Sequence, residues 1–343
     1  MRIVILGGTG FVGPSVVQGL LEHGHTVTLF HRGRTHTHLP DTVQHILGNQ
    51  EQLLDYQPTF AQLAPDVVLD MFAGTEAEGN ILMQTFRNIT GRVVVISSGD
   101  VYRAYDRLRK RQPGPPDPVP LTEDAPLREQ LYPYRATASG PGDPDYYYDK
   151  ILLERAVSSD PALPGTVLRL PMVYGPRDRQ HRLFRYLKRM DDRRPAILLD
   201  ACHAQWRWTR GYVENVAAAI VLAVTDQRAA GRIYNVGEVP ALTEAEWVRV
   251  IGQVGHWPGQ VIAVASEQVP PHLIHDLDFV HHLVLDTSRI RRELGYEESI
   301  GQAEALHRTI AWERANPPPA IDSANDEYAA EDVVLQNLAD PAP

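Results

Sequence analysis

The first 34 residues place a glycine-rich turn between two short apolar runs, and this arrangement limits the folds open to the chain. Residues 3–6 form a continuous apolar run, which is typical of a parallel strand buried on both faces. The turn GGTGFVG follows at 7–13, and apolar residues then recur at helical spacing until Gly24. Residues 26–30 have the composition of a second strand. Strand, glycine turn, helix and strand in this order are the context that a dinucleotide-binding turn requires.

Each glycine of this turn has a physical role in such a site. Gly7 permits a tight turn, Gly10 leaves the backbone open to a pyrophosphate, and Gly13 lets the helix lie close to the strand. Free N–H groups and the helix dipole at the helix start favour a bound phosphate. Pro14 fits the first helical turn, where its missing donor costs little. The glycines are spaced GxxGxxG rather than GxGxxG, so an ordinary strand-to-helix turn is the alternative interpretation.

Composition narrows the class of protein. The chain has 343 residues, enough for one large or two ordinary domains, and its 43% hydrophobic content suits a globular core. Its single cysteine, Cys202, excludes an intrachain disulfide and a cysteine zinc cluster, and the histidines show no metal-ligand spacing. The opening apolar run is too short for a signal peptide, and no run approaches the roughly 20 apolar residues of a membrane span. We therefore expect a soluble, cytoplasmic protein. The net charge of −10 argues against a general nucleic-acid binder.

The end of the second strand bears on the choice of dinucleotide. An acid at this position often binds the ribose 2′-OH in folds of this type, but here His31 stands there, followed by Arg32 and Arg34. An arginine can hold a 2′-phosphate through paired charge-assisted bonds. We therefore expect NADP rather than NAD, and a solvated basic turn is the alternative. Asn49 follows a third predicted strand at 43–47, where an adenine edge could lie.

The next segments continue the alternation of strands and helices. Strands are predicted at 66–70 and 92–97, with helical residues between them at 80–89. Such alternation predicts an α/β fold, a Rossmann-type doubly wound parallel sheet whose ligands lie beyond the carboxyl ends of the strands. Ser98 falls at one of these ends. The basic, proline-rich stretch at 103–126 is expected to be a surface loop beside the site.

A tyrosine and a lysine farther along suggest an acid–base pair. Tyr146 and Lys150 are four residues apart, so on a helix they would share one face. An ammonium neighbour stabilises a phenolate and moves the phenol toward a useful acid or base. Tyr147 and Tyr148 compete for this role, but neither has a lysine four residues later.

Seven segments in order give the chain a resemblance to the extended short-chain dehydrogenase/reductases, in the NAD-dependent epimerase/dehydratase family. They span about residues 1–312 and are GGTGFVG (7–13), SSGDVY (97–102), YYYDK (146–150), LRLPMVYGPRD (168–178), YVENVAAAI (212–220), YNVGE (234–238) and DTSRIRRELGY (286–296). The resemblance implies a Ser–Tyr–Lys centre. Ser98 matches the family's Ser/Thr, Tyr146 its general acid/base, and Lys150 the residue that binds the nicotinamide ribose and lowers the tyrosine pKa.

The chain also departs from the family pattern. Arg103 replaces the glycine after the VY pair. Asp100 occupies the place of the dehydratase base, although Gly99 replaces its usual acidic partner, and a turn-capping role for Asp100 is the alternative. Arg207 and Arg210 lie near the family's pyrophosphate-binding arginines without falling on their positions. The second expected arginine, before Asp286, is absent, which puts a nucleotide-linked substrate in doubt.

The predicted organisation follows from these matches. Residues 1–170 form the dinucleotide-binding domain, with its sheet completed by parts of 211–240; residues 171–316 form most of a smaller α+β substrate domain, and 317–343 an acidic, Pro-rich tail. The residues expected to bind the dinucleotide are Gly7, Gly10, Phe11, Val12, Gly13, His31, Arg32, Arg34, Asn49, Ala73, Lys150 and Pro171.

These features predict an NAD(P)-dependent epimerase/dehydratase-type oxidoreductase acting on a sugar-nucleotide or a similar hydroxyl or keto substrate. An NADPH-consuming ketone or aldehyde reductase of the same family is the first alternative. A non-catalytic nucleotide- or RNA-binding protein on the same fold is the second, because the HRGR turn and the basic runs resemble some plastid RNA-binding members of the superfamily. A homodimer would be in keeping with the resembled family.

Overall fold

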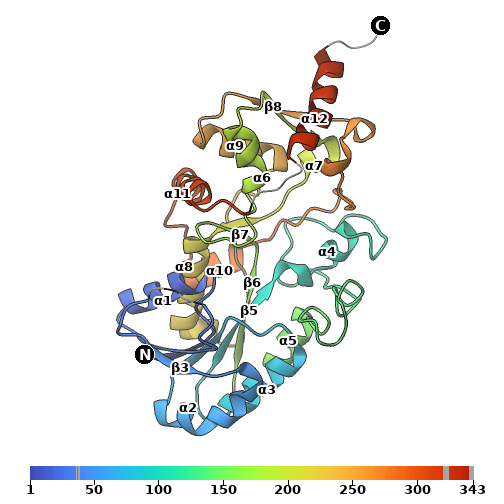
Figure 1. Cartoon of the computed structure of the whole chain (residues 1–343). Coiled ribbons are helices and arrows are strands. Elements are labelled where there is room, and N and C mark those ends of the chain that lie inside the picture. Colours follow the sequence, from blue (N-terminus) through green and yellow to red (C-terminus); the bar gives the residue numbers. More distant parts are fainter. Residues whose placement is uncertain (36, 38, 320–323, 340–343) are drawn as a thin grey trace.

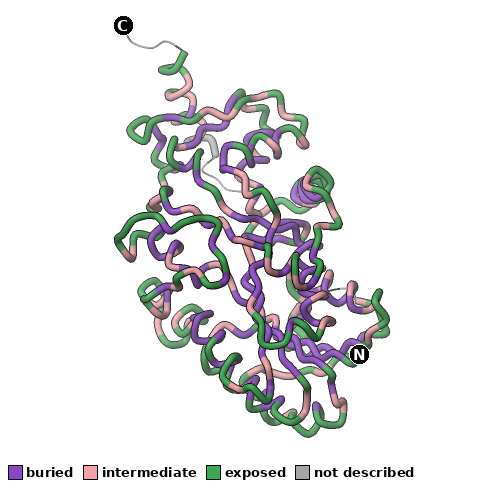
Figure 2. Tube along the Cα trace, turned by 180° about the vertical axis from the view of Figure 1, so that it is seen from behind, coloured by how far each residue is buried: buried purple, intermediate pink, exposed green. Residues whose placement is uncertain are grey.

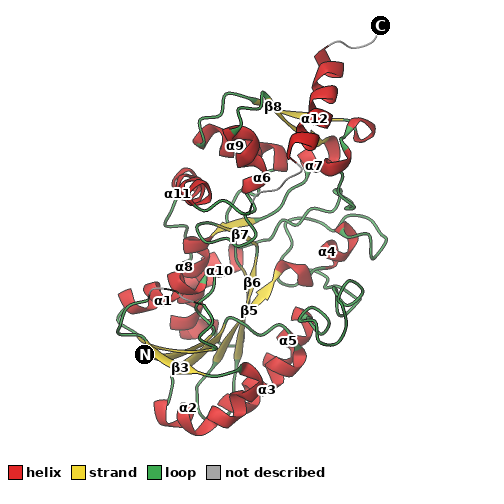
Figure 3. Cartoon of the chain, viewed as in Figure 1, coloured by secondary structure: helices red, strands yellow, loops and turns green. Residues whose placement is uncertain are grey.

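The structure, a computed structural model, describes residues 1–35, 37, 39–319 and 324–339. Its centre is a seven-stranded sheet in the order β10-β6-β5-β4-β1-β2-β3, with every neighbouring pair parallel (Figures 1 and 3). The strands are β1 (Arg2–Leu6), β2 (Thr26–His31), β3 (Gln44–Leu47), β4 (Val67–Asp70), β5 (Val93–Ser98), β6 (Gly165–Leu170) and β10 (Ile233–Asn235). The prediction of a Rossmann-type parallel sheet is confirmed.

Helices cover both faces of this sheet, which explains its continuous apolar strands. Along β1, Ile3 and Ile5 belong to one core cluster, whereas Val4 and Leu6 belong to another on the opposite face. The first face carries α1 (Gly13–Glu22), α8 (Val213–Thr225) and α10 (Ser288–Leu294); the second carries α2 (Gln57–Leu63), α3 (Glu76–Phe86) and α5 (Lys150–Val157). The strands are consequently buried along most of their length, except for the mostly exposed edge strand β3, and buried stretches of the trace gather at the sheet (Figure 2).

A second group of elements lies beyond the carboxyl ends of the strands. It contains two short parallel strand pairs and several helices, with the β8, α9 and α12 elements at the end of the molecule farthest from α2 (Figure 1). The elements are α4 (Arg103–Leu108), β7 (Met172–Tyr174), α6 (Phe184–Asp191), β8 (Ala196–Asp200), α7 (Ala201–Gln205), β9 (Arg210–Tyr212), α9 (Glu244–Val254), β11 (Gln260–Val264), α11 (Gln302–Ala315) and α12 (Ala324–Ala339). The larger core cluster continues from the sheet into this group without interruption.

The carboxyl-terminal segment, interpreted from its composition as a loosely held tail with at most a short helix at about 326–338, carries the helix α12. This helix is attached to α6 by an ion pair from Arg189 to Glu331, and to Arg194, three residues after α6, by an ion pair with Asp332. Arg189 and Glu331 are both buried. The sequence signal was misleading because the acidic composition of the tail suggested solvation, whereas these acids neutralise arginines that lie about 140 residues earlier.

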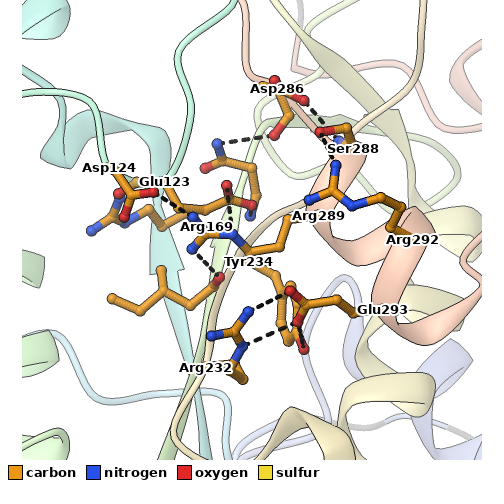
Figure 4. Close-up of polar contacts among 12 residues, drawn as sticks. Glu123, Asp124, Arg169, Arg232, Tyr234, Asp286, Ser288, Arg289, Arg292 and Glu293 are labelled. Atoms are coloured by element: carbon orange, nitrogen blue, oxygen red, sulfur yellow. Dashed lines mark hydrogen bonds and ion pairs between the residues drawn. The ribbon is translucent and has the colours of Figure 1, made fainter.

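Arg169 of β6 is the centre of a buried polar network beside the site. Its guanidinium makes two hydrogen bonds to the carboxylate of Glu154 on α5, at 2.9 and 2.7 Å, and donates to the backbone oxygen of Glu123 and to the Tyr102 hydroxyl. Figure 4 shows Arg169 beside the contacts that hold α10 on the edge strand β10, including the ion pair of Arg232 with Glu293. Arg169 and Glu154 are 2% and 5% exposed, whereas Arg232 and Glu293 are 45% and 28% exposed.

The two pairs predict very different effects of the same substitution. Glu154→Gln leaves Arg169 charged and uncompensated in the interior, so we expect it to lower the free energy of unfolding by about 3–5 kcal/mol. Glu293→Gln disturbs a partly solvated pair and should cost about 1 kcal/mol or less. Urea denaturation of both variants measures the difference. Equal losses in the two variants would contradict the central role given to Arg169.

Candidate active site

The glycine turn between β1 and α1 has the shape that a closely bound phosphate needs. Gly7 has a φ of +91°, a conformation that residues with a side chain rarely adopt. A Cβ on Gly13 would lie 2.3 Å from the Gly8 carbonyl oxygen, so only glycine lets α1 start this close to the turn. A Cβ on Gly10 would meet nothing within 4 Å, so the space above it is open. Phe11 and Val12, also expected at the cofactor, are half-buried against the core.

A cavity of about 90 Å³ opens beside this turn at the ends of β1, β2 and β3. It brings together five of the expected cofactor residues: Gly7, His31, Arg32, Arg34 and Asn49. The Arg32 guanidinium lies 5.4 Å from the centre of the Phe72 ring, which also lines the cavity. Among the described residues neither Arg32 nor Arg34 has an acidic ion-pair partner. His31 accepts a hydrogen bond from the Gly33 N–H and contacts His45 at 2.8 Å.

Lys150 stands at the first residue of α5 and reaches the carboxyl ends of two strands. Its Nζ donates to the backbone oxygens of Ala73 and of Ile96, the latter at 2.9 Å. Ala73 lies in the turn after β4, whose Asp70 carboxylate accepts the N–H groups of Phe72 and Ala73 at 2.7 and 2.9 Å. Lys150 is therefore held between the dinucleotide side of the sheet and the residues that follow β5.

A second cavity, of about 440 Å³, is lined by Ser98 and Asp100 at the end of β5, and Lys150 is part of the lining of neither cavity. Ser98 Oγ accepts the N–H of Asp100 at 3.2 Å. One carboxylate oxygen of Asp100 accepts the hydroxyls of Tyr134 and Tyr148, at 3.0 and 3.1 Å. The whole lining is Ser98, Gly99, Asp100, Tyr105, Tyr134, Tyr148, Leu170, Pro171, Met172, Gln180, Arg182, Trp208, Leu283 and Leu285.

Burial dominates the electrostatics of this second cavity. It raises the pKa of the Asp100 carboxyl, an effect that Arg128 and the phenol hydrogen bonds oppose. It raises the pKa of Tyr148 well above its ordinary value, and the Asp100 charge adds to this. It lowers the pKa of the Lys150 ammonium, although Asp100 and Asp70 counteract the shift. The carboxylate and the ammonium therefore stabilise each other's charged forms across the site.

The expected helical pairing of Tyr146 with Lys150 is wrong. Helix α5 begins only at Lys150, because Asp149 caps it by accepting the Ile151 N–H at 2.9 Å. Tyr146 precedes the helix in a loop, where its ring packs against Tyr147 with 4.9 Å between ring centres. Its ring centre is also 4.9 Å from the Arg135 guanidinium. Tyr146 is not part of the lining of either cavity.

The structure does not bring Arg207 and Arg210 to the cavities either. Arg210 is 5% exposed, pairs with Glu244 and stacks on Trp247, so its charge is already compensated inside the protein. Arg207 is exposed, and its backbone N–H donates to His282. The arginine that does line the second cavity is Arg182, which pairs with Asp178 at 2.7 Å. The expected basic loop at 103–126 is likewise compensated, since Arg103 and Arg107 both pair with Asp117, and its first residues form α4.

Several cavity residues were missed by the sequence interpretation. Tyr148 was considered only as an alternative to Tyr146, because the prediction relied on helical spacing from Lys150. Tyr134, Gln180 and Arg182 lie in irregular segments outside the recognised motifs. Only the tertiary structure brings such residues to the strand ends.

Comparisons with known proteins agree with this architecture. The model of the NAD dependent epimerase/dehydratase family matches residues 3–237. The chain is 26% identical to the dTDP-glucose 4,6-dehydratase of Streptomyces griseus, covering 91% of this chain and 93% of that protein. It is 27% identical to the 2′-dehydrokanamycin reductase of Streptomyces kanamyceticus, over 82% and 74%. The UDP-glucose 4-epimerase of Thermus thermophilus, solved in complex with NAD, has a TM-score of 0.65 at 21% identity, covering 92% of this chain and all of that one.

The fold, the glycine turn and the match over most of the chain define an enzyme of the extended short-chain dehydrogenase/reductase class. Within this class, the chain belongs to the NAD-dependent epimerase/dehydratase family. None of the helices that the structure describes combines the length and apolar character needed to cross a bilayer.

The buried Asp70 carboxyl gives the dinucleotide side of the site a predicted pH dependence. Burial raises its pKa to about 6, against the hydrogen bonds from Phe72 and Ala73. The folded state then binds more protons than the unfolded state between about pH 4 and 6, so this group's contribution to stability falls as pH rises through that window. Asp70→Asn should remove about 2 kcal/mol of this pH dependence between pH 4.5 and 7.5 while keeping both backbone hydrogen bonds. The free energy of unfolding at pH 4.5, 6 and 7.5 tests this, and parallel pH curves for the two proteins would contradict it.

Proposed function

We propose that the chain catalyses an epimerase- or dehydratase-type reaction on a nucleotide-linked sugar, with NADP as its dinucleotide. The observation that carries this proposal is the buried Lys150, whose Nζ donates to the Ala73 oxygen in the turn after β4 and to the Ile96 oxygen of β5. Phe72, directly before Ala73, lines the first cavity together with Gly7, and Ser98, two residues after Ile96, lines the second. This arrangement suits transfer of a hydride and a proton at one carbinol carbon.

The chain's own residues fit a dinucleotide. The turn at Gly7 to Gly13 accepts a pyrophosphate at the start of α1, and the cavity beside it accepts the adenosine half. Lys150 is placed to donate to the nicotinamide ribose once it leaves one of its two backbone acceptors. When bound, the oxidised dinucleotide supplies the hydride acceptor for the reaction.

Ser98 and Asp100 have separate roles in this proposal. Among the described residues the Ser98 hydroxyl has no acceptor for its own hydrogen, so it is available to orient a substrate oxygen. Asp100 is buried, and its Oδ1 has no hydrogen-bond partner in the described part of the chain. Asp100 can therefore receive a proton, which is the role of a base in dehydration. Pro171, Gln180 and Arg182 border the space left for the sugar.

One of the comparisons supports the reductase alternative. The 2′-dehydrokanamycin reductase matches over 82% of this chain, and its name describes reduction of a ketone on a sugar that is not nucleotide-linked. The second cavity is poor in cations, with Arg182 its one lysine or arginine side chain, so a pyrophosphate has few partners there. The two possibilities differ in whether the dinucleotide is regenerated in each turnover or NADPH is consumed.

Wild-type protein tests the proposal directly. It is incubated with NAD⁺ or NADP⁺ and a panel of UDP- and dTDP-hexoses, and separately with NADPH and keto sugars without a nucleotide. We expect a new sugar-nucleotide product by mass spectrometry with no net change in the dinucleotide. Stoichiometric consumption of NADPH with the free keto sugars, and no conversion of the nucleotide-linked ones, would establish the reductase instead.

The choice of NADP generates a test at the end of β2. Loss of a charge-assisted bond to the 2′-phosphate in Arg32→Ala or Arg34→Ala should weaken NADP⁺ binding about 10- to 100-fold and NAD⁺ binding by less than about threefold. The matched control is Arg228→Ala, which removes an exposed guanidinium paired with Asp226. Calorimetric titration measures all the affinities. Equal losses for both dinucleotides would overturn the 2′-phosphate role.

A further inference from the structure

Tyr148 lines the second cavity and makes the contacts that a catalytic phenol would need. Its ring packs over the turn after β4, because a Cβ on Gly74 would lie 3.1 Å from the ring. The Lys150 Nζ is 5.7 Å from the ring centre. Its hydroxyl lies in the second cavity and donates to Asp100 at 3.1 Å. One side chain thus contacts the turn that carries Ala73, faces the lysine and borders the cavity that contains Ser98.

The direction of this side chain is fixed by its neighbour. Asp149 is fully buried and forms an ion pair of 3.2 Å with Arg128, whose side chain is also fully buried. The Asp149 carboxylate also accepts the N–H groups of Tyr132 and Ile151, and its own N–H donates to the Gly74 oxygen at 2.8 Å. Because every polar group of Asp149 is engaged, the backbone that precedes it cannot turn without breaking several buried bonds. Tyr148 is therefore held in place before any ligand binds.

We propose that Tyr148, rather than Tyr146, is the catalytic phenol of this enzyme and that Asp100 is its proton partner. The inference rests on the proposed hydride-transfer function and names the residue that moves the proton. As the substrate C–H bond gives its hydride and electron pair to the oxidised dinucleotide, the substrate O–H proton passes to the Tyr148 oxygen. The Tyr148 proton then passes along the existing hydrogen bond to the Asp100 carboxylate, and the substrate carbon is left as a ketone. Return of the hydride reverses each transfer.

Other groups around Tyr148 support this direction of transfer. Asp100 from the turn after β5, Tyr105 from α4, Tyr134 and Arg128 from the following loop, and Lys150 from α5 are its titratable or charged neighbours. Tyr134 donates to the same Asp100 oxygen, and Tyr105 and Tyr134 share a 3.0 Å contact. A carboxylate whose pKa is raised by burial is a better proton acceptor than an exposed one. A lysine beside the phenol stabilises the phenolate that forms transiently during the proton transfer.

A titration without substrate tests the position of Tyr148. The alkaline ultraviolet difference spectrum records phenolate formation in wild type, Tyr148→Phe, Tyr146→Phe and Tyr147→Phe, with and without saturating NADP⁺, at pH values where the circular dichroism stays native. The positive nicotinamide ring should let about one of the fourteen phenols ionise at lower pH in wild type and in the Tyr146 and Tyr147 variants, but not in Tyr148→Phe. Loss of this shift in Tyr146→Phe with retention in Tyr148→Phe, or no shift in wild type, would overturn the proposal.

Kinetics on a sugar nucleotide that the wild type converts give the second measurement. Tyr148→Phe should lower kcat about 100- to 10,000-fold with KM nearly unchanged, and Tyr147→Phe, which alters an exposed ring, should match wild type. A fluorinated tyrosine at 148 should move the pH profile of kcat/KM to lower pH, an effect that a purely structural role would not produce. A normal kcat in Tyr148→Phe would refute the assignment. If wild type converts no sugar nucleotide, the proposed function fails, whereas the phenol titration still decides the role of Tyr148.

Discussion

The buried ion pair between Arg169 and Glu154 is the interaction on which the arrangement of the site depends. Glu154 accepts two bonds from Arg169 and one, at 2.5 Å, from the Ser97 hydroxyl. Arg169 continues to the Tyr102 hydroxyl, which donates to Asn235 at 2.6 Å. The network therefore ties together the ends of β5, β6 and β10 and the helix that starts with Lys150. A buried charge pair stabilises little by itself, but its directional bonds admit only one relative placement of these elements.

This network also explains why the recognised segments were a good guide to the fold. The segment SSGDVY contributes two members of the network, Ser97 and Tyr102, and one member each comes from YYYDK with the four residues after it, from LRLP and from YNVGE. The alternating strands and helices were predictable because each carries its own periodicity, and the ends of β3, β4 and β5 differ from prediction by at most one residue. The glycine turn was also predictable, because the backbone conformation of Gly7 and the close approach of Gly13 to Gly8 both arise within one short segment.

The parts that were not predictable are those in which charge is compensated over long sequence distances. Arg210 lies near the positions of the family's pyrophosphate-binding arginines. It is buried, however, and its charge is compensated by Glu244, 34 residues later. Arg189 of α6 and Arg194, three residues after this helix, are likewise paired with Glu331 and Asp332 of α12, about 140 residues later. Composition shows that charges exist but not which of them face one another. Arg32 and Arg34, in contrast, line a cavity and have no acidic ion-pair partner among the described residues.

The start of α5 shows how a small error in one boundary changes a chemical assignment. The spacing rule that linked Tyr146 to Lys150 assumes that both residues are helical. Asp149 instead ends the loop and begins the helix, because Arg128 draws its carboxylate into a fully buried pair. Arg128 lies 21 residues away in an irregular segment, and no local pattern predicts its contact with Asp149. With the helix beginning four residues later than expected, the phenol nearest the lysine and the strand ends is the one directly before the capping aspartate. A motif can therefore point to a segment while the tertiary structure decides which of its three tyrosines lines the cavity.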